Sequence, residues 1–142
     1  MRFENEITQL EIPVDIFVQM LAWAKANAPM EACGILAGRD CKVEKLYEMS
    51  NVDNKSTHFM MKPKEQFAVV KEIRSAGLEM LCIYHSHPST PARPSAEDIR
   101  LALTANVTYV IVSLQNAEHP VVKGFEIDNG TVREVPIKTK VG

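Results

Sequence analysis

The sequence of 142 residues has no long hydrophobic segment and no excess of charge of either sign. A membrane-spanning helix needs about 20 consecutive apolar residues, and no run in the sequence approaches that length. The 16 Lys and Arg residues and 18 Asp and Glu residues give a net charge of -2. This balance argues against a basic surface for nucleic acids or anionic membranes. The opening stretch, MRFENEITQLEIP, mixes acids with apolar residues, so we expect no signal peptide.

Cysteine is also scarce. The three cysteines, Cys33, Cys41 and Cys82, form no Cys-x-x-Cys pair, and their odd number does not fit a disulfide framework. We therefore expect reduced thiols and a cytoplasmic protein. Each cysteine is interpreted as a small buried apolar residue rather than a reactive thiol.

Apolar strands and amphipathic helices alternate along the chain. Its length fits one compact domain, residues 1–142, and the 46% of hydrophobic residues is enough for a substantial core. The patterns predict helices within residues 13–27, 62–77 and 95–104, and strands over residues 5–12, 32–38, 43–50, 58–61, 79–85, 107–114, 121–127 and 131–137. This interleaving predicts an α/β or α+β fold with a mixed central sheet.

Two histidines follow one of the apolar strands, in the stretch IYHSHPSTPARPSAED at residues 83–98. Because side chains alternate along a strand, His85 and His87 point to the same face, with Cα atoms about 6.5–7 Å apart. Two imidazoles at that separation can share a metal ion, whereas Ser86 points the other way. The pair is expected at the C-terminal end of an inner strand, where α/β sheets usually carry their sites.

The loop after the histidines contains three prolines, so holding it in one shape costs little entropy. It leads into the predicted helix at 95–104, in which Ser95 and Asp98 are one turn apart. Asp98 can reach back to an ion held by the histidines, with Ser95 beside it. Two neutral imidazoles and one carboxylate leave a fourth position for water, as in catalytic zinc sites.

Simpler interpretations of these residues stay open. Ser95 and Asp98 also fit a capping box at the start of a helix, and the histidines can be two polar strand residues. The two interpretations of Ser95 are compatible, because a cap can still present its oxygen to a substrate. Other His-x-His metal folds fit poorly, since amidohydrolase barrels need about 250 residues and cupins lack the three helices predicted here.

The spacing His85-x-His87, seven residues, Ser95, two residues, Asp98 resembles the complete signature of the JAMM metalloproteases, also called MPN-plus domains. The family's upstream glutamate matches Glu31 in PMEACGILAG, and HFMMKPKEQF resembles its strand-to-helix passage. The similarity extends from residue 29 to about residue 115. It implies a cytidine-deaminase-like fold with one zinc ion, for which His85, His87 and Asp98 are the ligands.

The resemblance also implies the chemistry of the site. Zinc lowers the pKa of its water to about 7, Glu31 takes the proton, and the resulting hydroxide attacks an amide carbonyl. Ser95 and the zinc stabilise the oxyanion, and Glu31 passes the proton to the leaving amine. Without the family, Glu31 would be interpreted as a solvated residue after the first helix.

Members of this family cut peptide or isopeptide bonds at the C-terminal tails of ubiquitin-like proteins. The compact chain resembles the prokaryotic branch, whose substrates are small β-grasp proteins, including sulfur carriers with Gly-Gly tails. No cysteine follows Cys82 and only His119 follows His87, so we expect no second zinc. We expect a zinc metallopeptidase with a ubiquitin-like or sulfur-carrier partner, and neither nucleic acid nor membrane as a partner. A non-catalytic MPN-type scaffold and a zinc hydrolase acting on a small amide remain as alternatives.

Overall fold

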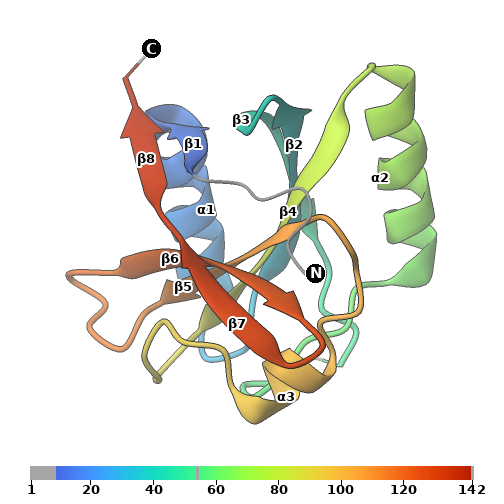
Figure 1. Ribbon diagram of the computed structural model, residues 1–142. Coiled ribbons are helices and arrows are strands. Elements are labelled where there is room, and N and C mark those ends of the chain that lie inside the picture. Colours follow the sequence, from blue (N-terminus) through green and yellow to red (C-terminus); the bar gives the residue numbers. More distant parts are fainter. Residues whose placement is uncertain (1–8, 54, 142) are drawn as a thin grey trace.

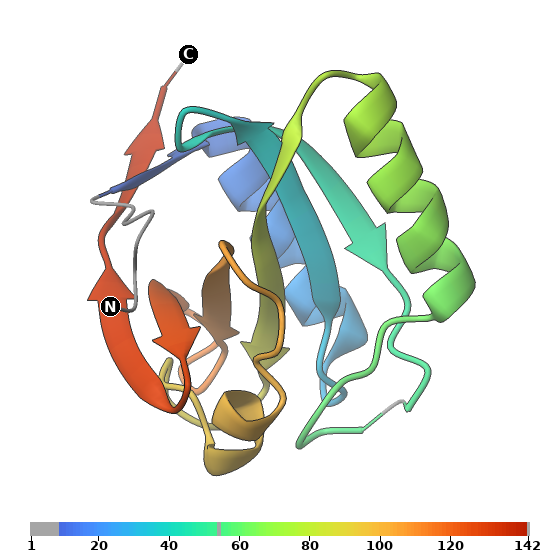
Figure 2. The same cartoon turned by 45° about the vertical axis from the view of Figure 1, so that its right-hand side comes forward.

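The computed structural model describes residues 9–53 and 55–141, which form a mixed sheet with helices on both faces (Figures 1 and 2). In chain order the elements are β1 (Leu10–Pro13), α1 (Val14–Asn27), β2 (Cys33–Arg39), β3 (Lys42–Met49), α2 (Pro63–Ser75), β4 (Glu79–His87), α3 (Ala96–Arg100), β5 (Thr108–Ser113), β6 (Val121–Asp128), β7 (Thr131–Val135) and β8 (Ile137–Lys140). The predicted mixed α/β architecture is confirmed. Among the described residues, no helix has the length and apolar character needed to cross a bilayer.

Strand β4 lies inside the sheet, whose strand order is β7-β6-β5-β4-β2-β3-β1-β8. It pairs antiparallel with β2 on one side and parallel with β5 on the other. The parallel pair β4–β5 needs a long crossover, and this crossover contains the proline-rich loop and α3. The contacts of Asp98 with His85 and His87 place the first turn of α3 at the edge of the sheet at which β4 ends.

From Cys82 onward, alternate residues of β4 face two separate apolar cores. Cys82 and Tyr84 join the cluster that contains Met20 of α1, whereas Ile83 joins the cluster that contains Ile73 of α2. Both faces are covered, which explains why the inner strands are continuous apolar runs rather than alternating ones. His85 and His87 follow Ile83 at intervals of two, so they belong to the face that carries α2.

Beside the buried part of this strand, residue 34 has to be glycine. Gly34 of β2 pairs directly with Tyr84 of β4, and a Cβ atom at Gly34 would overlap the Tyr84 ring. Because Tyr84 is fully buried, its ring has no open space into which it can move. The missing side chain at residue 34 therefore makes room for the aromatic ring on the α1 face.

Five predicted elements differ from the structure. The helix predicted at 95–104 ends at Arg100, and residues 58–61 form a single bridge, Asn51 with Met61, instead of a strand. The strand predicted at 131–137 is interrupted by Pro136, after which β8 leaves β7 and pairs parallel with β1. The first strand begins at Leu10 in the described chain and includes Pro13, so α1 begins one residue later than predicted. Residues 5–8 of that predicted strand lie outside the described residues.

Candidate metal centre

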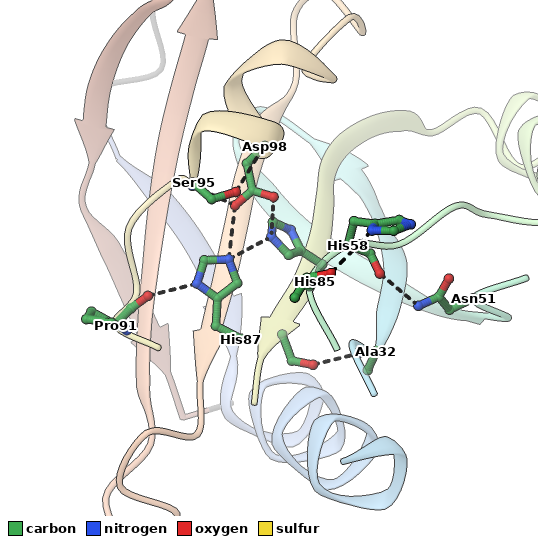
Figure 3. A network of polar contacts seen from close by, with 10 residues as sticks. Ala32, Asn51, His58, His85, His87, Pro91, Ser95 and Asp98 are labelled. Carbon is green, nitrogen blue, oxygen red and sulfur yellow. Dashed lines mark hydrogen bonds and ion pairs between the residues drawn. The ribbon is translucent and has the colours of Figure 1, made fainter. Parts of the chain in front are cut away.

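His85 and His87 lie at the C-terminal end of β4, between β2 and β5. Both are buried, with 2% and 4% of their surfaces exposed. Their Nε2 atoms are 3.2 Å apart, so the two rings converge on one point, as the strand alternation predicted. Figure 3 shows the two imidazoles and the Asp98 carboxylate turned toward one another.

Asp98 comes to this point from the first turn of α3. Its Oδ1 lies 3.2 Å from His85 Nε2, and its Oδ2 lies 3.0 Å from His87 Nε2. The same carboxylate accepts a hydrogen bond from the Ser95 amide, and the Ser95 hydroxyl accepts one from the Asp98 amide. The capping box is therefore present, and it holds the Asp98 carboxylate in the orientation that faces the histidines.

The proline-rich loop fixes the orientation of His87. Its Nδ1 lies 2.8 Å from the Pro91 carbonyl oxygen, and because a carbonyl only accepts, Nδ1 carries a proton. The loop is in turn held to β5 by a 2.6 Å hydrogen bond from the Ser113 hydroxyl to the Thr90 carbonyl. A ring nitrogen bonded to a backbone carbonyl is the usual arrangement behind a metal-binding imidazole, since it leaves the other nitrogen facing the metal.

The charges at this point favour a bound cation. Although burial opposes ionisation, hydrogen bonds from His85 and His87 hold the pKa of Asp98 well below its usual range. Burial likewise opposes a charged His87, but hydrogen bonds to Asp98 and Pro91 raise the pKa of this imidazole. In the metal-free chain these two pKa directions therefore favour a protonated imidazole beside the ionised Asp98 carboxylate.

The three side chains fit a zinc ion in both type and spacing. Among the described residues, His85, His87 and Asp98 form the group of potential ligands whose donor atoms all lie within 4.8 Å of one another. Tetrahedral zinc with bonds of about 2.0–2.1 Å places neighbouring ligand atoms about 3.3 Å apart. The two histidine nitrogens are 3.2 Å apart, close to this value, and each lies 3.0–3.2 Å from a different oxygen of the Asp98 carboxylate. Two nitrogens and one oxygen leave one tetrahedral position for another ligand.

Glu31 lies just before β2 and is buried, with 2% of its surface exposed. Burial and then the charge of Asp98 raise the pKa of Glu31 to about 8, and His87 acts in the opposite direction. The Glu31 carboxyl is therefore close enough to two of the candidate ligands, Asp98 and His87, to interact with their charges. Its Oε1 has no hydrogen-bond partner among the described residues. A buried, unpartnered carboxyl with a pKa near neutrality is suited to taking up and releasing a proton.

Comparison with known proteins decides the family. Residues 13–126 match the family described as prokaryotic homologues of the JAB domain. The chain belongs to this family. The match covers most of the sequence, including every residue of the centre, and the resemblance to the JAMM proteins is confirmed.

Individual proteins are similar to this chain over most of its length. The CysO-cysteine peptidase of Mycobacterium tuberculosis is 33% identical over 130 residues, which cover 90% of this chain and 89% of that protein. The probable TtuB-protein conjugate cleaving protease of Thermus thermophilus is 36% identical over 103 residues, which cover 72% and 68%. The solution structure of protein DSY2949 from Desulfitobacterium hafniense has a TM-score of 0.86, with 42% identity and 94% of each chain covered.

Ser86 explains how this JAB domain places Glu31. Its hydroxyl accepts a 2.8 Å hydrogen bond from the Ala32 amide, and its own amide donates to the Ala32 carbonyl at 3.0 Å. Ser86 stands between the two histidines and points to the opposite face, as expected from the alternation. No local sequence pattern assigns a role to Ser86, because its partner is 54 residues away.

Asn51 and Phe59 complete the surroundings of the centre. The Asn51 side-chain amide donates to the carbonyls of Glu31 and His58, and its oxygen accepts from the Met60 amide. Asn51 and His58 are labelled in Figure 3. Phe59 stacks on the His85 ring, with centroids 4.8 Å apart. The segment that was predicted as a strand is therefore a wall of the site, held in place by one asparagine. Asn51 carried no recognisable signal in the sequence.

Cys33 is the cysteine nearest to Glu31 in the sequence, and it is not suited to nucleophilic chemistry. Burial is the main cause that raises its pKa to about 12. Cys33 and Cys82 are free and buried, as predicted, whereas Cys41 is half-buried in the turn between β2 and β3.

Proposed function

We propose that this protein is a zinc peptidase that hydrolyses the peptide or isopeptide bond at the C-terminal tail of a ubiquitin-like or sulfur-carrier protein. The chain is a hydrolase of the JAMM type. The observation that carries the proposal is the convergence of two imidazoles and one carboxylate beside a buried, protonatable glutamate. The similar proteins named for CysO-cysteine and TtuB-conjugate cleavage support this substrate class.

In the proposed site, His85, His87 and Asp98 would hold the zinc ion. When bound, zinc supplies Lewis-acid activation of a water molecule and of the scissile carbonyl. Glu31 would accept a proton at its carboxylate from the attacking water and would pass it to the leaving amine. The burial of Glu31 near Asp98 and His87 suits this role, because in the metal-free protein these surroundings favour a carboxyl that holds a proton.

Ser95 is proposed to donate a hydrogen bond to the developing oxyanion. In the described structure its hydroxyl accepts from the Asp98 amide, so the hydroxyl proton remains available as a donor. Ser95 is exposed, which allows a substrate carbonyl to approach it. The capping and catalytic roles therefore use different parts of the same hydroxyl group.

We further propose that residues 1–142 form a single JAB domain with a cytidine-deaminase-like fold and one zinc ion per chain. The mixed sheet covered by helices on both faces supports this description of the fold. A cytoplasmic location is proposed because all three cysteines are free.

The test uses zinc-loaded protein and a β-grasp carrier whose Gly-Gly tail is extended by a short segment. We expect cleavage after the second glycine, measured by the mass of the carrier, and loss of cleavage when a chelator is added. Tight binding without cleavage would instead support the MPN-type scaffold. Hydrolysis of small amides but of no carrier would support the third alternative.

A further inference from the structure

A cleft of about 380 Å³ opens beside the candidate metal centre. Two of the proposed ligands, His85 and Asp98, form part of its wall, so its inner end is adjacent to the reacting atoms of any bound substrate. Its volume lies within the range of about 300–1,000 Å³ that is usual for small-ligand sites. The cleft is therefore large enough for a bulky side chain and the backbone that carries it.

The walls of the cleft are mainly apolar. Most of the lining belongs to the segment held by Asn51, to strands β4 and β5, and to the residues after α3, and includes Phe59, Met60, Ile83, Leu101, Leu103 and Tyr109. Met60 and Leu103 are 54% and 84% exposed. Large apolar side chains left in solvent next to a reaction centre provide surface that a substrate can bury.

Charged groups are nearly absent from the lining. Among the described residues that line the cleft, none is Lys, Arg or Glu, and Asp98 is a proposed metal ligand. His58 is paired with Asp53 at 3.1 Å. A charged substrate side chain would lose its hydration here without gaining an ion pair, whereas an apolar one would be stabilised by burial.

The position of the cleft indicates which substrate residue enters it. This step rests on the proposed function, in which the acyl side of the scissile bond is a Gly-Gly tail without side chains. On the acyl side, the nearest residue with a side chain is two positions before the glycine of the scissile bond, about 7 Å away along an extended chain. The cleft contacts the metal ligands themselves, so the side chain that reaches it belongs to the residue directly after the scissile bond.

We infer that this peptidase selects substrates in which a large apolar residue, such as Leu, Met or Phe, follows the terminal Gly-Gly of the carrier. The leaving group is then an apolar amino acid, or a segment that begins with one. The cleft between the Phe59–Met61 segment and the residues after α3 is the subsite for that side chain.

The inference is tested with one carrier protein extended beyond Gly-Gly by a single residue: Leu, Met, Phe, Ala or Asp. We expect kcat/KM for the three large apolar residues to exceed that for Ala by about 10- to 100-fold, and Asp to be the poorest substrate. Binding to the Glu31→Gln variant, measured by calorimetry, should follow the same order. A carrier joined to a lysine side chain through an isopeptide bond is included for comparison.

Two variants locate the subsite. Met60→Ser and Leu103→Ser change exposed side chains and should lower the ratio of the Leu rate to the Ala rate toward one. Val18→Ser, at an exposed position of α1 that does not line the cleft, should leave the ratio unchanged. A change in the ratio separates loss of selectivity from a general loss of activity.

The outcomes separate the inference from the proposed function. Equal rates for all extensions, a preference for Ala or Asp, or faster cleavage of the isopeptide would overturn the apolar leaving-group subsite while leaving the peptidase intact. A ratio that is insensitive to Met60 and Leu103 would also overturn it. Failure to cleave any extension, with the chain folded and loaded with zinc, would contradict the proposed function itself.

Discussion

Replacing Glu31 by glutamine tests the centre directly, because it removes an ionisable proton and nearly preserves the shape of the side chain. In the metal-free chain, burial first and the charge of Asp98 second raise the pKa of Glu31 from 4.5 to about 8. In the unfolded chain the same carboxyl is solvated and keeps its ordinary pKa. Between these two values the folded protein therefore binds a proton that the unfolded chain has released.

The sign and size of the effect follow from this difference. The free energy of unfolding falls as the pH rises through the window from 4.5 to about 8, because the folded state holds the extra proton there. Since one pKa unit corresponds to about 1.4 kcal/mol, the largest loss is about 5 kcal/mol. We expect the Glu31→Gln variant to lack this loss. It should be several kcal/mol more stable than the wild type at about pH 8 and should approach it below pH 4.5.

The assay is urea denaturation of chelator-treated protein over this pH range, with Glu118→Gln, at an exposed position, as the matched control. With zinc added, the Glu31→Gln variant should bind one ion per chain and hydrolyse no substrate. Parallel pH profiles for wild type and variant would refute the burial argument. Loss of zinc would make Glu31 a ligand, and normal turnover would remove it from the proposed mechanism.

Three other substitutions test the assembly of the centre. His85→Ala should abolish the expected binding of one zinc per chain, as measured by metal analysis; full retention would contradict the ligand assignment. Ser86→Ala leaves the Ala32 amide without its acceptor. We therefore expect the free energy of unfolding to fall by about 1–3 kcal/mol and kcat to fall with KM little changed. The control Ser89→Ala, at an exposed position, should change neither stability nor kcat. Gly34→Ala forces a Cβ into the Tyr84 ring, and urea denaturation should show about 1–3 kcal/mol of destabilisation; wild-type stability would mean that the two strands can separate there.

The local parts of the centre could be predicted because they depend on short-range geometry. Strand alternation alone places His85 and His87 on one face, and one helical turn separates Ser95 from Asp98. The two open interpretations of Ser95 and Asp98 turned out not to compete. The hydrogen bonds that cap α3 are the ones that hold the carboxylate toward the imidazoles.

The remaining parts depend on distant contacts that no local pattern records. Glu31 could be identified only through the family, because the hydrogen bonds that fix the backbone next to it join Ala32 to Ser86, 54 residues away. Residues 58–61 have the composition of a strand, but the Met60 amide bonds to the Asn51 side chain instead of a neighbouring strand. The break at Pro136 could have been predicted, since proline cannot donate a hydrogen bond within a sheet; the pairing of β8 with β1 could not.

These long-range contacts make the register between β2 and β4 a determinant of the centre. A slip of one residue would turn His85 and His87 to the α1 face, away from Asp98. Two contacts oppose that slip: the Tyr84 ring needs the open space over Gly34, and Ser86 needs the backbone of Ala32. Both lie on the face that carries no proposed ligand. The packing of the α1 core therefore determines which face of β4 presents the imidazoles, and a substitution at Gly34 should alter zinc binding without touching a ligand.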